Sequence, residues 1–95
     1  MSLVLIARWY AKEGAENEVA DILPLIAEKS RAEPGCLTYR PVRSTTNGRE
    51  FTLFEEYADE SALEHHRSSA HFRDLVLGKV VPLLEEREVG VFTDV

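Results

Sequence analysis

The sequence is poor in cysteine and in long apolar runs. Cys36 is the only cysteine of the 95 residues, so no internal disulfide can form and the fold does not need an oxidising compartment. The apolar run at residues 3–7 is too short for a signal peptide or a membrane span, and no basic leader precedes it. We therefore expect a cytoplasmic location and no membrane partner.

Basic residues are also few. The chain has 11 Lys and Arg, scattered along the sequence, against 17 Asp and Glu, which gives a formal net charge of −6. A protein that binds nucleic acid needs a basic stripe to contact phosphates, and an anionic membrane surface attracts a basic cluster. We therefore expect no nucleic acid among the partners.

Motifs that anchor nucleotide cofactors or form common hydrolytic centres are missing as well. The sequence contains no G-x-G-x-x-G, no Walker A, no H-E-x-x-H and no G-x-S-x-G. Flavin, nicotinamide and nucleotide cofactors therefore have no visible anchor, and we expect no cofactor.

What the sequence does contain is typical of one small globular domain, which we place at residues 1–95. Apolar residues make up 44% of the chain and charged residues 29%, which are ordinary globular values. A domain of this length buries only a limited share of its surface, so self-association is a reasonable expectation before any motif is considered.

The apolar spacing predicts the order strand, helix, strand, strand, helix, strand. Period-two or mixed apolar patterns predict strands, and apolar residues three and four apart predict helices. The expected strands are 3–10, 36–43, 50–57 and 88–95; the expected helices are 15–32, a short one from 59 to 66, and a longer one from 69 to 86. This order is typical of an α+β, ferredoxin-like split βαβ fold, with a four-stranded antiparallel sheet and helices on one face.

Prolines and turn residues refine this pattern. Pro24 should kink the first helix without ending it, and Pro82 is a weak point near the end of the last one. Pro41 cannot donate to a strand ladder, which favours a sheet edge or a bulge for residues 36–43. Asn47-Gly48 is a hairpin signal, and Asp59 is a plausible N-cap of the short helix.

Both faces of the predicted sheet carry large apolar groups. They are Leu3, Val4, Leu5 and Ile6 in the first strand and Phe51, Leu53 and Phe54 in the third. Helices can cover only one face, and each fully buried large side chain contributes roughly 1.5–3 kcal/mol. We therefore expect a homodimer in which two sheets pack face to face. The alternative is a monomer with a few exposed aliphatic residues.

Three histidines lie close together, at His65, His66 and His71. Three histidines can form a zinc site, but neighbours on a helix point in different directions, and no H-x-x-x-H pair or matching cysteine pair occurs. We therefore expect no metal site. His65 is expected to face solvent, and His71 to bond the loop before its helix.

His66 has two interpretations that the residues leave open. It falls one turn after Ala62 and next to Leu63, on the side of the short helix that should be buried. There it could polarise a bound hydroxyl or carbonyl, or take a proton near neutral pH. It could equally be a hydrogen-bonded histidine of the core or of an interface.

Other polar residues are ambiguous in the same way. Trp9 and Tyr57 have an apolar body with one polar tip, which suits an aromatic-binding pocket or an ordinary core. Glu55 shares the strand face of its apolar neighbours, so it should be partly buried and need a cationic or histidine partner. Cys36 has no base nearby and is expected to be a structural thiol.

Residues 33–75 resemble the signature of the antibiotic-biosynthesis monooxygenase domain, and the similarity extends over nearly the whole chain. The matching positions are Pro34-Gly35-Cys36, Glu55, Tyr57, Ala62-Leu63, His66 and Ser69-Ala70-His71-Phe72. The resemblance implies a dimeric α/β barrel with a pocket between sheet and helices in each subunit. It also implies oxygenation of a small aromatic substrate, a quinol or polyketide-like phenol, by dioxygen without metal, flavin or haem.

The resemblance further implies which residues form the site. His66 and Tyr57 would be catalytic, and Trp9, Glu55, His71 and Phe72 would bind the substrate. Two departures stand out: the family commonly has tryptophan where this chain has Tyr57, and the first strand has apolar Ala7 where haem-degrading relatives have asparagine. The second departure argues against haem degradation. Because one fold hosts several reactions, an isomerase of a small cyclic or keto compound and a non-catalytic binding module stay open.

Overall fold

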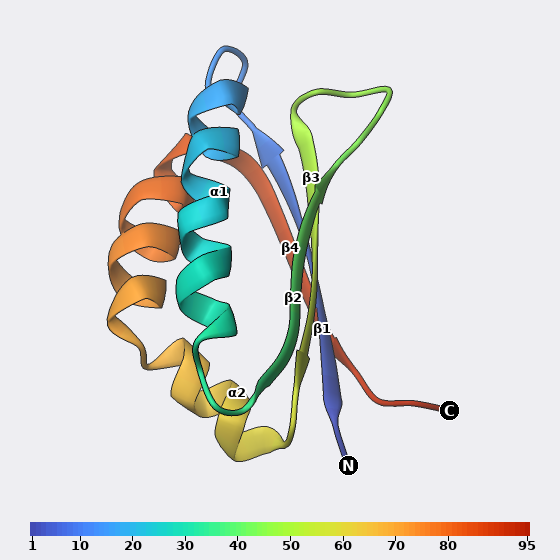
Figure 1. Cartoon of the computed structure of the whole chain (residues 1–95). Coiled ribbons are helices and arrows are strands. Elements are labelled where there is room, and N and C mark those ends of the chain that lie inside the picture. Colours follow the sequence, from blue (N-terminus) through green and yellow to red (C-terminus); the bar gives the residue numbers. More distant parts are fainter.

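Four strands form one antiparallel sheet with the order β2-β3-β1-β4 in the computed structural model, which describes residues 1–95 (Figure 1). The strands are β1 (Leu3–Ala11), β2 (Cys36–Arg43), β3 (Glu50–Tyr57) and β4 (Leu84–Phe92). Pro41 lies in β2, which is an edge strand as the sequence predicts, and the β2–β3 register shifts between Cys36 and Thr38. The α+β, ferredoxin-like fold is confirmed.

All helices cover one face of this sheet. They are α1 (Glu16–Arg31), α2 (Glu60–Arg67), the π-helix η1 (Phe72–Val80) and the short 3-10 helix η2 (Val81–Leu83). In Figure 1, α1 and η1 lie side by side over the sheet, and α2 lies at the lower end of this layer. Val19 and Ile26 of α1 are fully buried against the sheet, where each contributes about 1.5–3 kcal/mol.

Local interactions fix the position of α2. Asp59 caps the helix, because its carboxylate accepts a hydrogen bond of 2.8 Å from the backbone N–H of Ala62. Gly35 packs directly beneath the helix: a Cβ at Gly35 would lie 2.3 Å from the Cβ of Ala62. Only glycine therefore permits the turn between α1 and β2 to approach α2 this closely.

The end of the last helix differs from the sequence prediction. Residues 69–86 were expected to be helical and 88–95 extended, but the helical segment ends at Leu83 and β4 begins at Leu84. Pro82 lacks a backbone donor, which weakens the helix there. Pairing with β1 then takes over, because Leu84 lies opposite Ala11 in the register and the N–H of Lys12 donates to the carbonyl of Leu83 over 2.8 Å.

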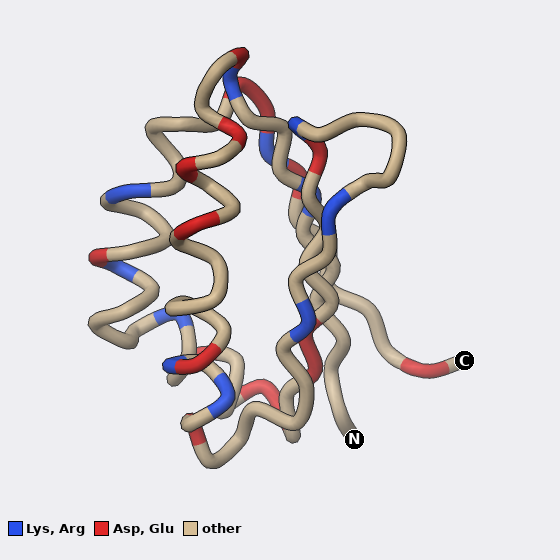
Figure 2. Tube along the Cα trace, turned by 45° about the horizontal axis from the view of Figure 1, so that its top comes forward, with Lys and Arg blue, Asp and Glu red and all other residues tan.

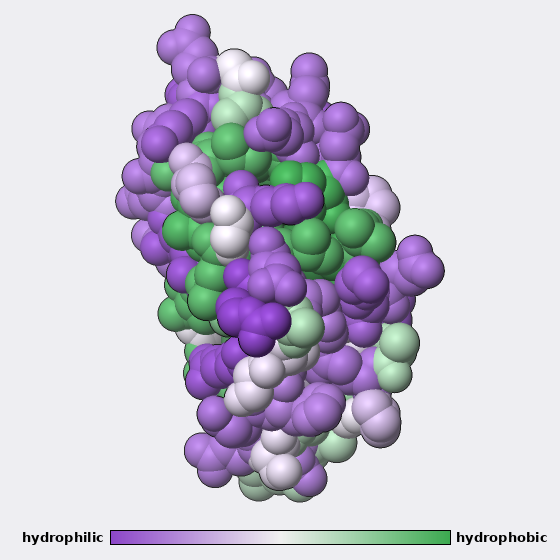
Figure 3. Space-filling model, turned by 90° about the vertical axis from the view of Figure 1, so that its left-hand side faces the viewer, coloured by the Kyte–Doolittle hydropathy of each residue, from purple (hydrophilic) through white to green (hydrophobic).

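The face of the sheet away from the helices is apolar at its centre. The register places Ile6 opposite Phe54 and Val4 opposite Phe92 on this outer face. Phe54 is 40% exposed and Phe92 52% exposed. Apolar side chains also gather on the upper half of the helical side, amid hydrophilic ones (Figure 3).

Charges of both signs are spread over helices and strands, without a basic stripe (Figure 2). None of the helices has the length and hydropathy that a membrane crossing requires.

Candidate functional site

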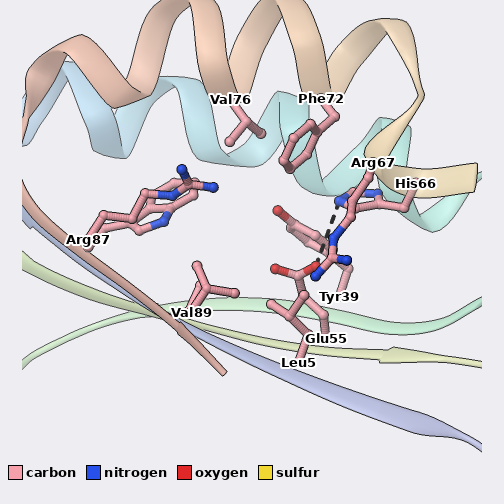
Figure 4. A pocket seen from close by; sticks show the side chains of 11 residues that line it. Leu5, Tyr39, Glu55, His66, Arg67, Phe72, Val76, Arg87 and Val89 are labelled. Atoms are coloured by element: carbon pink, nitrogen blue, oxygen red, sulfur yellow. Dashed lines mark ion pairs between the residues drawn. The ribbon is translucent and has the colours of Figure 1, made fainter. Parts of the chain in front are cut away.

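A cavity of about 380 Å³ lies between the inner face of the sheet and the helices α2 and η1 (Figure 4). Its floor and far end come from the strands and its roof from the helices. The lining residues are Leu5, Ala7, Trp9, Tyr39, Glu55, Arg87 and Val89 of the sheet, with His66 and Arg67 of α2 and Phe72 and Val76 of η1. This volume lies at the small end of the roughly 300–1,000 Å³ typical of ligand pockets.

The alternation of β1 builds the floor of the cavity. Leu5, Ala7 and Trp9 point inward because successive strand residues face opposite sides, and all three are buried. Leu5 lies opposite Glu55 of β3 in the register, which brings a carboxylate onto an otherwise apolar floor. The floor is therefore mostly apolar, with one carboxylate on it.

His66 is the central polar group of the cavity. Its side chain is 3% exposed, and its ring lies within 5.1–5.9 Å, centroid to centroid, of the rings of Tyr57, Phe72 and Tyr39. Nδ1 donates to Oε2 of Glu33 over 2.8 Å, which leaves the lone pair on Nε2. Burial lowers the pKa of His66, although the carboxylate of Glu33 opposes that change. The ring is therefore a neutral base at neutral pH.

Glu55 faces this base. One of its oxygens lies 3.7 Å from Nε2 of His66, the contact drawn as a dashed line in Figure 4. The hydroxyl of Tyr57 donates to the same Oε1 over 2.5 Å. Burial raises the pKa of Glu55 to about 7, while the bond from Tyr57 lowers it. A histidine, as expected for Glu55, lies beside it, and the pKa of Glu55 falls in a range useful for proton transfer.

Tyr57 supports Glu55 from outside the cavity. Its side chain is fully buried, and it is not among the residues that line the cavity. Burial raises the pKa of the Tyr57 hydroxyl, and the neighbouring carboxylate of Glu55 raises it further. The hydroxyl therefore stays protonated and acts as a donor to Glu55.

Glu33 links His66 to a second histidine. Its Oε2 accepts from Nε2 of His71 over 2.6 Å as well as from Nδ1 of His66, and its Oε1 is buried without a partner. Ser69 stabilises the pair, since its hydroxyl lies 3.2 Å from Nε2 of His71 and donates to the carbonyl of His66 over 2.6 Å. A carboxylate that accepts from the far side of an imidazole holds one tautomer and orients the ring.

Glu33, His66 and His71 also have the side-chain types of a metal site, although no metal site is expected from the sequence. One ligand atom each from Glu33, His66 and His71 lies within 4.8 Å of the others. Two imidazoles and a carboxylate suit zinc or iron by donor type. Both ring nitrogens, however, are directed at one oxygen at 2.6 and 2.8 Å, so the geometry is that of a carboxylate shared by two hydrogen bonds.

The structure brings together most of the residues that the sequence singled out. Trp9, Glu55, His66 and Phe72 line the cavity, whereas Tyr57 lies behind Glu55 and His71 behind His66. His65 is exposed, as expected. Sequence reasoning missed four residues of the site, Glu33, Tyr39, Arg67 and Arg87. No local signal ties Glu33 to a histidine 33 residues later.

Cys36 lies near this cluster without contributing to it. Its thiol is within 3.5 Å of the carbonyl of Thr38. Burial, together with the carboxylates of Glu33 and Glu55, raises the pKa of Cys36 to about 11. The thiol is therefore protonated and a poor nucleophile, in line with a structural role.

Comparison with known proteins assigns the chain to a family. Residues 2–76 match the family model described as antibiotic biosynthesis monooxygenase. The chain belongs to the antibiotic biosynthesis monooxygenase family. Within curated proteins, it is 34% identical over 70 residues to Rv0793 of Mycobacterium tuberculosis, whose name describes it as an inferred monooxygenase; the match covers 74% of this chain and 68% of that protein.

Solved structures similar to this chain share the whole fold. The structure of Rv0793 superposes with a TM-score of 0.91 at 30% identity, covering 100% of this chain and 96% of that one. PA3566 of Pseudomonas aeruginosa gives a TM-score of 0.90 at 29% identity, covering 99% and 94%. A crystal structure described as an antibiotic biosynthesis monooxygenase gives 0.92 at 29% identity, with 98% of each chain covered.

Proposed function

We propose that this chain is a cofactor-independent monooxygenase that oxidises a small aromatic substrate, a quinol or polyketide-like phenol, with dioxygen. The observation that carries the proposal is the buried, neutral imidazole of His66, which has Nε2 on the side of Glu55 in an apolar cavity lined by aromatic rings. Membership of the monooxygenase family supports the same reaction class.

The first step is removal of a proton from the substrate. A phenolic hydroxyl bound against Nε2 of His66 gives its proton to the ring, and the carboxylates of Glu33 and Glu55 stabilise the resulting imidazolium. The product of this step is a phenolate held in a mostly apolar cavity. The apolar floor and the rings of Trp9 and Phe72 orient it and exclude water.

The substrate itself supplies the electrons for the next step. The phenolate passes one electron to dioxygen, and the two radicals join through a new C–O bond at a ring carbon that bears hydrogen. Protonation from the imidazolium gives a hydroperoxide. A base then removes the hydrogen from that carbon, the O–O bond breaks, and water leaves. One oxygen atom ends as a quinone carbonyl and the other as water. The phenol loses four electrons in total, which are the four that dioxygen gains.

Dimerisation belongs to the same proposal. The outer face of the sheet exposes Phe54 and Phe92 around Ile6, and no helix covers it. A second copy that packs its own outer face against this one would bury these side chains symmetrically, at roughly 25 cal/mol for each Å² of apolar surface.

Oxygen consumption tests the proposed reaction. Metal-stripped protein is offered a panel of hydroquinones and hydroxylated polycyclic phenols in an oxygen electrode, beside His66→Ala and the matched control His65→Ala, whose side chain is exposed on the same helix. We expect uptake above the spontaneous rate, lost in His66→Ala and kept in His65→Ala. Turnover that continues under nitrogen would replace the proposal with an isomerase, and ligand-induced thermal stabilisation without turnover would replace it with a binding module.

A further inference from the structure

Two arginines line the cavity without a direct side-chain hydrogen bond or ion pair. Arg67 comes from α2 and Arg87 from β4, and both are exposed residues that line the cavity. Figure 4 shows them toward opposite ends, with Arg67 beside His66 and Glu55 and Arg87 at the far end. No ion pair or side-chain hydrogen bond of the structure includes either guanidinium; the arginine ion pairs are Arg49–Glu85 and Arg73–Asp74.

The carboxylates near Arg87 are engaged elsewhere or face away, whereas Arg67 lies beside the carboxyl group of Glu55. Glu85, two residues before Arg87, pairs with Arg49. Glu86 and Glu88 lie opposite Tyr10 and Arg8 in the β1–β4 register, on the outer face of the sheet. Arg87 is therefore a positive charge without a carboxylate partner at the rim of the cavity, in a chain whose net charge is −6. Such a cavity favours an anionic ligand.

The end of the cavity at Arg87 has a second free donor. Trp9 lies opposite Arg87 in the register, and its indole N–H is buried without an acceptor. A buried donor left unpaired is costly, and an arginine fork matches the two oxygens of a carboxylate. Both groups at this end are therefore hydrogen-bond donors without an acceptor, and a carboxylate of a ligand could supply one.

We propose that the substrate is a hydroxyaryl carboxylate: its carboxylate binds Arg87 at the Trp9 end, and its hydroxyl lies between His66 and Arg67 at the other. The reactive role of the hydroxyl rests on the proposed oxygenase function, whereas the binding of the acid does not. Arg67 stabilises the phenolate once His66 has taken the proton, and Arg87 holds the acid before and after that step. Arg87 therefore governs binding and Arg67 governs the chemical step.

Binding under nitrogen tests this assignment without turnover. The probe is 6-hydroxy-2-naphthoate, which has the two groups at opposite ends of a two-ring aromatic, and its matched neutral partner is 6-hydroxy-2-naphthamide. By isothermal titration calorimetry we expect the acid to bind about tenfold or more tightly than the amide, as one charge-assisted contact predicts. The preference should shrink as salt is raised, because the arginine lies at an open rim.

Variants assign the preference to one residue. Arg87→Gln should abolish the preference for the acid, Arg87→Lys should keep part of it, and Arg67→Gln should leave it intact. Arg73→Gln is the matched control, since Arg73 pairs with Asp74 on the surface and does not line the cavity. Equal affinity for acid and amide, no binding of the acid, or a preference that survives Arg87→Gln would each overturn the inference.

The two proposals fail separately. If the acid is preferred and no phenol causes oxygen uptake, the oxygenase proposal falls and the carboxylate site stands. If neutral quinols are oxidised and the acid shows no preference, the carboxylate site falls and the oxygenase stands. If uptake occurs, Arg67→Gln should lower kcat with little change in KM, whereas Arg87→Gln should raise KM for the acid alone.

Discussion

Nδ1 of His66 and Oε2 of Glu33 form a buried hydrogen bond of 2.8 Å between α2 and the residue that precedes the Pro34-Gly35 turn. Because Nδ1 carries the proton, Nε2 is left as the acceptor on the side of Glu55. The contact therefore decides which nitrogen of His66 is available for proton transfer.

Replacing Glu33 with glutamine tests that relationship. Glu33→Gln keeps the shape of the side chain but removes the negative charge that stabilises a protonated His66. We expect the pKa of His66 to fall further, activity on any substrate to fall by about 10²-fold or more, and the free energy of unfolding to fall by about 1–3 kcal/mol. Imidazole NMR and denaturant titration measure these changes. Glu28→Gln, on the exposed side of α1, is the control, and an unchanged His66 pKa would contradict the assigned role.

Glu55 makes stability depend on pH in a defined direction. Burial raises its pKa from 4.5 to about 7, so the folded protein holds a proton that the unfolded chain releases. This contribution is fully present below pH 4.5 and is lost as pH rises through 7, by about 3 kcal/mol at 1.36 kcal/mol for each pKa unit. Glu55→Gln should therefore gain stability relative to the unmodified protein as pH rises from 4.5 to 7.

The opposite sign applies to His66, which provides an internal check. Burial lowers its pKa below 6.5, so its contribution is lost as pH falls below that value. Denaturant titrations at several pH values give the free energy of unfolding of the unmodified protein and of each variant. The difference between the unmodified protein and Glu55→Gln should fall as pH rises, whereas the difference for His66→Gln should rise, so the two slopes have opposite signs. Parallel slopes would show that these two groups do not control the pH dependence.

Gly35 controls the position of α2 and with it the cavity. Gly35→Ala would place a Cβ 2.3 Å from that of Ala62, so α2 must shift. We expect a loss of about 1–3 kcal/mol in the free energy of unfolding and weaker ligand binding. Adding Ala62→Gly removes the clashing methyl group and should recover part of that loss, beyond its own helix cost of about 1 kcal/mol. Additive losses in the double variant would rule out the contact as the cause.

The outer face of the sheet predicts the oligomeric state. Phe54→Asp places a charge at the centre of the proposed interface and should convert a dimer to a monomer in light scattering after size-exclusion chromatography. Leu77→Asp is the control, because Leu77 is exposed to a similar extent, 43% against 40%, on the helical side. A protein that is monomeric before substitution, or a Phe54→Asp variant that stays dimeric, would refute the proposed interface.

Much of the fold could be predicted from local pattern. Residues 36–43 and 50–57 are strands with the expected bounds, Asp59 caps α2, and Pro41 lies in an edge strand. The predicted hairpin connects β2 and β3, but Gly48 does not adopt positive φ. Instead, the side chains of Ser44 and Asn47 accept hydrogen bonds from backbone N–H groups of the loop. These features depend on neighbours in the chain, which is why their signals are local.

The sequence by itself determined the order of the strands and helices, the two apolar faces of the sheet and the inward side of His66 and Glu55, because strand alternation and helix periodicity follow from the residues themselves. The tertiary structure alone decided where the last helix gives way to β4, since pairing with Ala11 outweighed the apolar stripe that continues to Leu84. It also decided that Glu33 bonds His66 and that Arg67 and Arg87 line one cavity. Those relationships join residues far apart in the chain, and only the packing of α2 and β4 brings their side chains within reach.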